Sequence, residues 1–166
     1  MFLCLFCLET GAKVPQQPSS TTNQQQTESQ TRPGEVEEPK RQELEEGIKH
    51  VLVSQVEAWN RGNLQNYMKG YWRSPDLTFF SGAAVTKGWE PTLQRYQQRY
   101  QGQGKEMGKL EFQDLKIDLL SRRAAVITGK WQLTMSDGKQ PHGLFTLIMK
   151  RMQGGWHIVH DHTSAE

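Results

Sequence analysis

Apolar residues recur at every third or fourth position between Leu44 and Trp59. This spacing predicts an amphipathic helix over residues 41–61, because positions three and four apart share one face of a helix. Gly62 follows at the place where a helix commonly ends. Gln55 is the polar exception beside the apolar stripe. One long face of this helix is therefore expected to pack against the rest of the domain.

Two shorter helices are predicted further along the chain. Asn63 is a good capping residue, and the helix that follows it ends at the turn of residues 74–76. The apolar positions of that helix are Leu64, Tyr67, Met68 and Tyr71. The other helix follows Gly88, and its apolar face is formed by Trp89, Leu93, Tyr96 and Tyr100. Both helices are thus expected to be amphipathic.

The rest of the pattern is typical of β-strands. A short strand is predicted over residues 77–81, before the third helix. Four longer strands are predicted over residues 110–120, 124–135, 142–152 and 156–164. Turn residues stand between them as Arg122-Arg123, Asp137-Gly138 and Gly154-Gly155. Three helices followed by a meander indicate an α+β fold, in which the helices cover one face of an antiparallel sheet.

The last strand alternates so that two histidines share a face. Successive side chains of a strand point to opposite faces. One face is expected to carry Trp156, Ile158, His160, His162 and Ser164. The opposite face is expected to carry His157, Val159, Asp161 and Thr163. The pattern predicts that the histidine face forms the wall of a pocket.

The first 39 residues differ in composition from the remainder. Residues 1–8 are apolar but too few to span a bilayer, which takes about 20 residues in a helix. Residues 16–39 are poor in large apolar side chains and are expected to form a flexible linker. The division is therefore 1–39 and a domain at 40–166, and limited proteolysis should leave a fragment that begins near Lys40.

The apolar start has two interpretations. If it is a truncated signal with a misassigned start, the protein is exported or tethered to the envelope. If it is only an apolar N-terminus, the protein is cytoplasmic. Cys4 and Cys7 both precede the domain, so no disulfide or thiol nucleophile is available to the fold.

The charge balance argues against nucleic acid as a partner. The net charge is +2, and a nucleic-acid surface needs basic residues gathered on one face. Lys69, Arg73 and Lys87 are scattered instead. Neither a nucleic-acid partner nor a membrane span is predicted.

Several short motifs between residues 43 and 164 carry a resemblance to a known superfamily. They are AWNRGNL at 58–64, YW and SPDL at 71–77, TKGW at 86–89, and GW followed by HDHTS at the end. In order and spacing the chain resembles the SnoaL-like branch of the nuclear transport factor 2 superfamily, and within it uncharacterised bacterial proteins of the YybH type. The His-x-His-x-Ser ending is also similar to the association domain of calcium/calmodulin-dependent kinase. The resemblance implies a cone-shaped fold, with three helices on a curved antiparallel sheet around an open cavity.

The resemblance extends to ketosteroid isomerases, but their catalytic residues are not matched. In those enzymes a carboxylate on the first strand takes the proton, and a Tyr and a protonated Asp bind the oxyanion. The position of the carboxylate falls on Ser81, and that of the Tyr falls on Gln55. Residues 144–151 offer no carboxylate for the remaining role. Steroid-isomerase chemistry is therefore not expected.

The histidine pair supports three interpretations. As catalytic residues, His160 and His162 would supply imidazoles suited to proton transfer near neutral pH. As pocket residues, they would only hydrogen-bond to nearby hydroxyls. As metal ligands, they would need a third partner from His142 or Asp161, but Asp161 is expected to face away. Neither a metal nor another cofactor is predicted.

Two functions of different classes follow, because the superfamily contains enzymes, binding domains and assembly modules. The first is binding of a small, partly apolar molecule between the helices and the sheet, with acid-base catalysis as an extension. The expected pocket residues are Gln55, Trp59, Tyr71, Ser81, Trp89, Tyr96, Trp131, His160 and His162. The alternative is a non-catalytic association module that forms a homodimer through strands 124–135 and 142–152. A cavity plugged by Trp72 and Trp131 would favour the alternative.

Overall fold

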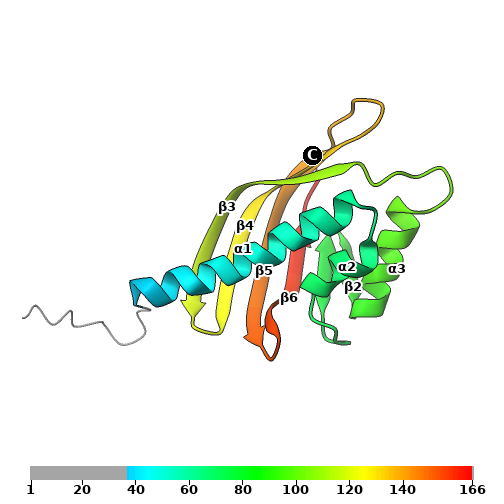
Figure 1. Ribbon diagram of the computed structural model, residues 1–166. Helices are drawn as coiled ribbons and strands as arrows, with labels where there is room; N and C mark the ends of the chain where they lie inside the picture. The colour runs from blue at the N-terminus through cyan, green and yellow to red at the C-terminus, as the bar shows by residue number, and fades with distance from the viewer. Residues whose placement is uncertain (1–36, 166) are drawn as a thin grey trace, which may run out of the picture. The chain divides into compact units, whose positions relative to one another are not determined.

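The computed structural model describes residues 37–165, so the expectations for the apolar start and the linker before residue 37 lie outside the described residues. The elements in order are α1 (Glu38–Asn60), α2 (Leu64–Tyr67), η1 (Met68–Gly70), β1 (Thr78–Ser81), β2 (Ala84–Lys87), α3 (Trp89–Tyr100), β3 (Lys109–Ser121), β4 (Ala124–Thr134), β5 (His142–Met152) and β6 (Gly155–Thr163). The helices lie on a six-stranded, curved sheet that does not close (Figure 1). The predicted α+β class is confirmed.

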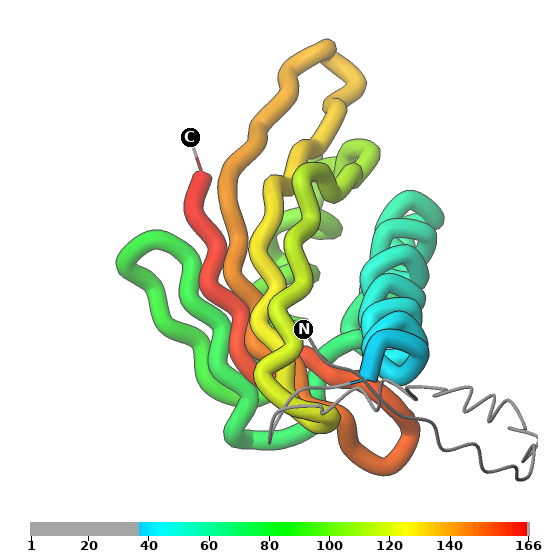
Figure 2. The backbone as a smooth tube through the Cα atoms, turned by 90° about the vertical axis from the view of Figure 1, so that its left-hand side faces the viewer, coloured from blue at the N-terminus to red at the C-terminus, as the bar shows by residue number. Residues whose placement is uncertain are grey.

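Helix α1 is the long amphipathic helix that the apolar spacing predicts. It begins at Glu38, three residues before the predicted start, because Pro39 fits the first helical turn, where backbone N–H groups lack a partner within the helix. Its buried residues are Leu44, Ile48, Leu52, Gln55, Ala58 and Trp59. The helix runs along one face of the sheet, as the side view shows (Figure 2).

The chain then turns through two short helical segments. The side-chain oxygen of Asn63 accepts a hydrogen bond from the backbone N–H of Asn66 at 2.9 Å, so Asn63 caps α2 as predicted. The helix is shorter than predicted, because it passes into the 3-10 turn η1 and ends at Gly70. Tyr71 therefore lies outside the helix, and its backbone forms an isolated bridge with Ile158 of β6.

The strand order is β2-β1-β6-β5-β4-β3. The three hairpins from β3 to β6 are antiparallel, as the turn residues predict. The pair β1 and β6 differs from the prediction, because these two strands are parallel. Strand β2 was not predicted; it is a short, largely exposed edge strand without the apolar alternation of a half-buried strand. The parallel pair places β1, the first strand in the chain, next to β6, the last strand.

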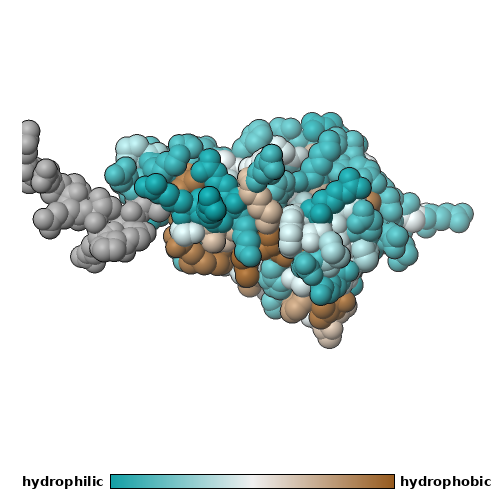
Figure 3. Space-filling view, turned by 90° about the horizontal axis from the view of Figure 1, so that it is seen from below, coloured by the Kyte–Doolittle hydropathy of each residue, from teal (hydrophilic) through white to brown (hydrophobic). Residues whose placement is uncertain are grey.

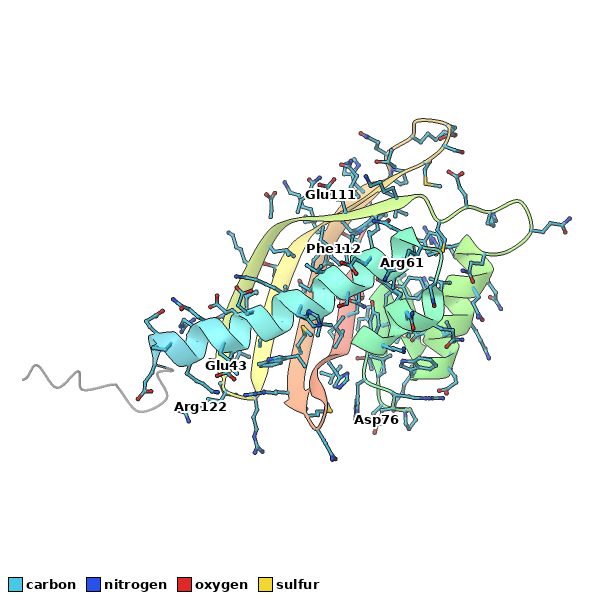
Figure 4. The ribbon with its side chains drawn as sticks, viewed as in Figure 1. Glu43, Arg61, Asp76, Glu111, Phe112 and Arg122 are labelled. Atoms are coloured by element: carbon cyan, nitrogen blue, oxygen red, sulfur yellow. The ribbon has the colours of Figure 1, made fainter. Side chains whose placement is uncertain are left out.

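The inner face of the sheet, on the side of α1, forms the core with the helices. On β5, Phe145, Leu147 and Met149 are buried, whereas Leu144 on the outer face is 51% exposed. Figure 4 shows the same division on β3, where Phe112 lies on the inner side and its neighbour Glu111 on the outer side. The core therefore lies between α1 and the inner face.

Candidate functional site

A cavity opens between the helices and the inner face of the sheet. Its volume, measured as the space open to the centre of a water-sized sphere, is about 90 Å³. This is several times the space that one water molecule needs. The aromatic residues of its wall are Trp59, Tyr67, Tyr71, Phe79, Tyr96, Tyr100, Phe112, Trp131 and Phe145. The cavity is therefore mostly apolar, with hydroxyl groups on part of its surface.

Six of the nine predicted pocket residues line this cavity. They are Gln55, Trp59, Tyr71, Ser81, Tyr96 and Trp131. Trp89 is not among the lining residues, because its ring nitrogen donates to the carbonyl of Met68 at 2.9 Å and the side chain is buried at the start of α3. His160 and His162 are also absent from the lining.

Gln55 reaches the cavity because a glycine leaves room for it. Its side-chain nitrogen donates to the carbonyl of Tyr67 at 3.2 Å, which satisfies part of a buried amide. A Cβ atom at Gly70 would lie 2.6 Å from the Cδ atom of Gln55, closer than carbon atoms approach. Gly70 therefore supports the position of Gln55 in the wall.

The prediction that His160 and His162 face the pocket is wrong, and a β-bulge is the reason. Ile158 pairs with Met149, but the next pair along β5 joins Ile148 to His160. Val159 is thus an extra residue on β6, and it reverses the alternation that follows. His160 and His162 lie on the outer face beside Phe80, with ring centroids 4.9 and 6.1 Å from it. His160 also shares a hydrogen bond of 2.7 Å with Thr78.

The same bulge turns Asp161 inward, opposite to the prediction from strict alternation. Asp161 is 5% exposed and lines the cavity. Its Oδ2 atom accepts a hydrogen bond of 2.7 Å from the hydroxyl of Tyr71. Its Oδ1 atom is buried and has no hydrogen-bond partner among the residues that the structure describes. Asp161 is therefore the carboxyl group of the site, and one of its oxygens has no hydrogen-bond partner among the described residues.

Tyrosine hydroxyls gather around this carboxyl group. The hydroxyl of Tyr71 lies 3.5 Å from that of Tyr67 and 3.4 Å from that of Tyr96. Tyr71 comes from the loop before β1, Tyr67 from α2 and Tyr96 from α3. Three separate parts of the chain thus place their hydroxyls near one carboxylate.

Burial dominates the proton equilibria of this cluster. Burial raises the pKa of Asp161 to about 7, and the hydrogen bond from Tyr71 opposes the rise only in part. Burial, together with the charge of Asp161, raises the pKa of Tyr71 well above its usual value. Near neutral pH the tyrosine therefore stays a neutral donor, while the carboxyl group populates both of its protonation states.

The domain with this fold matches a known protein family. The SnoaL-like domain family matches residues 48–166. The chain belongs to the SnoaL-like domain family. No curated protein sequence matches the chain.

Solved structures support the same assignment of this SnoaL-like domain. An NTF-2 like protein of unknown function from Shewanella oneidensis is 36% identical with a TM-score of 0.68, and the match covers 72% of this chain and 98% of that chain. A putative calcium/calmodulin dependent protein kinase II association domain from Xanthomonas campestris is 19% identical with a TM-score of 0.54, covering 72% and 85% of the two chains. A ketosteroid isomerase-like protein from Erwinia carotovora atroseptica is 16% identical with a TM-score of 0.59, covering 74% and 95%. The last two show likeness of fold alone.

The site contains residues that sequence reasoning missed. Asp161 was assigned to the opposite face, and nothing in the local pattern of β6 reveals the bulge. Arg95 and Arg99 of α3 also line the cavity. Their spacing of four residues, next to Tyr96 and Tyr100, was a signal that they share a face with the aromatic stripe.

The described part of the chain shows neither a cluster of metal ligands nor a helix that could span a membrane. Within residues 37–165, no three His, Cys, Asp or Glu side chains come together as ligands for a metal ion. His160 and Asp161 point to opposite faces, which separates two of the candidate ligands. None of the helices in the described part of the chain is long and apolar enough to cross a membrane.

Proposed function

We propose that this SnoaL-like domain binds a small, partly apolar molecule in the cavity, and that Asp161 exchanges a proton with it. The observation that carries the proposal is the state of Asp161, a buried carboxyl group in an aromatic cavity with one partnered and one unpartnered oxygen. A buried polar atom without a partner is uncommon, and functional sites are one of its recurrent explanations.

The two oxygens of Asp161 have different roles in this proposal. Oδ2 is held by Tyr71, which fixes the orientation of the carboxyl group. Oδ1 has no partner and is the atom that would accept a proton from the bound molecule or return one to it. A group with a pKa near the working pH is effective both as a base and as an acid. The carboxyl group therefore suits proton transfer at neutral pH.

The carboxylate of the proposed site lies at a different position in the fold from the catalytic base of steroid isomerases. The position of their base is occupied by Ser81, which lines the cavity but carries no carboxylate. The carboxylate here comes from β6, next to Phe79 of β1 in the parallel register. A proton-transfer role thus rests on Asp161 alone among the cavity-lining residues.

The proposal is tested with p-cresol, a one-ring phenol whose hydroxyl can donate to Oδ1. We expect saturable shifts in the NMR spectrum of the domain as p-cresol is added. The affinity for p-cresol should rise between pH 5.5 and 8, because Asp161 ionises in this range with a pKa of about 7. Asp161→Asn should abolish this pH dependence, and His162→Gln on the outer face should leave it unchanged. Absence of binding, or a pH profile that survives in Asp161→Asn, would contradict the proposal.

A second candidate, association of two copies through the outer face of the sheet, rests on a separate observation. Val126 and Ile148 pair across β4 and β5 and are only half-buried, and Leu144 is half exposed. The surface seen from below is mostly hydrophilic, with apolar residues gathered in a few patches (Figure 3). Apolar residues on the outer face of a sheet are expected where that face is covered. This candidate is compatible with a ligand in the cavity on the inner face.

A further inference from the structure

Two arginine side chains line the same cavity as Asp161. Arg95 and Arg99 are four residues apart on α3, a spacing that places them on one face of the helix. The guanidinium carbon of Arg95 lies 5.5 Å from the ring centroid of Phe79, and that of Arg99 lies 5.5 Å from the ring centroid of Tyr100. Both rings belong to the cavity wall. The aromatic wall therefore holds both guanidinium groups at the cavity.

Neither arginine has a carboxylate partner among residues 37–165. This contrasts with four arginines elsewhere in the domain, each of which lies 3.7 Å or less from a glutamate: Arg41, Arg61, Arg73 and Arg151. Two positive charges thus stand on the wall of a mostly aromatic cavity, and neither forms an ion pair among residues 37–165.

Neither Arg95 nor Arg99 forms an ion pair with the carboxyl group of Asp161. In the register of β1 and β6, Phe79 is the neighbour of Asp161, and the guanidinium of Arg95 lies against the ring of Phe79. The cavity wall therefore carries two kinds of polar group, the carboxyl group of Asp161 and the guanidinium groups of Arg95 and Arg99.

We infer that the cavity takes a small amphipathic carboxylate, with an apolar, ring-sized body, a hydrogen-bonding group at Asp161 and the carboxylate group at Arg95 and Arg99. This inference rests on the proposed function and adds the substrate class to it. The planar guanidinium group matches a carboxylate in geometry and can donate two parallel hydrogen bonds to it. An aromatic wall suits the body of such a molecule.

The experiment compares two probes of nearly the same shape, one with a charged and one with a neutral end group. 4-Hydroxyphenylacetate carries a phenol hydroxyl and a carboxylate at its two ends, and 4-hydroxyphenylacetamide carries a neutral amide in place of the carboxylate. We expect the carboxylate to bind about tenfold more tightly at low salt, because hydrogen bonds to charged groups are the stronger ones. The preference should shrink as the salt concentration rises, since exposed charges are screened.

Variants locate the preference on the arginines. Arg95→Gln and Arg99→Gln should each reduce the preference, and the double variant should bind both probes about equally. The matched control is Arg122→Gln, at the turn between β3 and β4 and away from α3 (Figure 4), which should keep the full preference. A thermal melt of each variant verifies that the domain is folded.

The outcomes separate the two proposals. Equal affinity of the unchanged domain for both probes, or a preference that survives in the double variant, would overturn the carboxylate inference and leave the proposed function standing. Failure of both probes to bind would overturn the proposed function together with the inference.

Discussion

At the scale of single residues, the burial of the Asp161 carboxyl group costs the domain stability when that group is ionised. A carboxyl group that is buried beside aromatic rings resists ionisation, and its hydrogen bond from Tyr71 relieves this only partly. Active sites commonly retain such groups at the expense of stability. The free-energy cost of ionising buried Asp161 can therefore be measured separately from any activity.

The stability of the domain should depend on the ionisation of Asp161. The pKa rises from 3.8 in the unfolded chain to about 7 in the folded domain, so between these values the folded state binds more protons. The contribution of protonated Asp161 to the free energy of unfolding is therefore fully present below about pH 4, and it is lost as the pH rises to about 7. The rise in pKa corresponds to about 4 kcal/mol at most.

Asp161→Asn should remove this dependence. At pH 8 we expect the variant to be more stable than the unchanged domain by about 1 to 3 kcal/mol, because it has no charge to bury but leaves an amide group incompletely bonded. At pH 4 the two should be similar. Urea unfolding at both pH values measures the difference. Asp118→Asn, at an exposed position of β3, serves as the control. A variant that is equally stable at pH 8 would show that Asp161 is not raised in pKa.

At the scale of secondary-structure elements, the extra residue in β6 decides which side chains face the cavity. Val159 lies between Ile158, which bridges Tyr71, and His160, which pairs with Thr78 of β1. The strand changes its neighbour at this point, from the loop before β1 to β1 itself. The bulge lets Ile158 and Asp161 both face inward although they are three residues apart.

Deletion of Val159 should therefore be tolerated. With Val159 removed, strict alternation places Ile158 inward, His160 outward and Asp161 inward, which is the arrangement already present. We expect a loss of about 1 to 2 kcal/mol, because a half-buried side chain and a favourable twist are lost. Urea unfolding measures the loss, and the pH dependence of stability verifies that Asp161 is still buried.

Deletion of Thr146 is the matched control for the bulge. It lies in a regular part of β5, between the buried residues Phe145 and Leu147. Its removal would turn one of these two side chains outward, at a cost of about 2 to 5 kcal/mol. If the two deletions were equally damaging, the bulge would not be what orients the end of β6.

At the scale of the whole domain, the two faces of the sheet are suited to different tasks. The inner face carries the cavity, and the outer face carries His160, His162 and exposed apolar residues. The likeness to the association domain from Xanthomonas campestris is a likeness of fold alone. Association through this face would not obstruct a cavity that lies on the other side.

We expect the domain to form a homodimer through the outer face at micromolar concentration. Leu144→Glu should shift it to the monomer, because a charge would be buried without a partner, while the 51% exposure of Leu144 leaves folding unaffected. Leu120→Glu is the control, at a residue that is 58% exposed near the end of β3. Light scattering on the full chain distinguishes the 19.1 kDa monomer from its dimer. A domain that is monomeric before any substitution would exclude the proposed association.

The sequence by itself determined the helices, the strands other than β2, and the family. Three features of the sequence are local signals: the helical spacing of α1, the cap at Asn63 and the turns between the long strands. The motifs that resemble SnoaL-like proteins are likewise short stretches of the chain. These features depend on residues close together in the chain, so their physical causes are visible in the sequence.

Only the tertiary structure decided which residues form the site. The inward turn of Asp161 depends on the bulge at Val159, and the bulge depends on the pairing of β6 with β5 and with β1. The partners of β6 in β1 lie about 80 positions away in the chain. The place of Arg95 and Arg99 in the wall depends on how α3 packs against Phe79 and the rings beside it. Alternation along one strand cannot reveal an extra residue that its neighbouring strands accommodate, because a bulge is a property of the pairing.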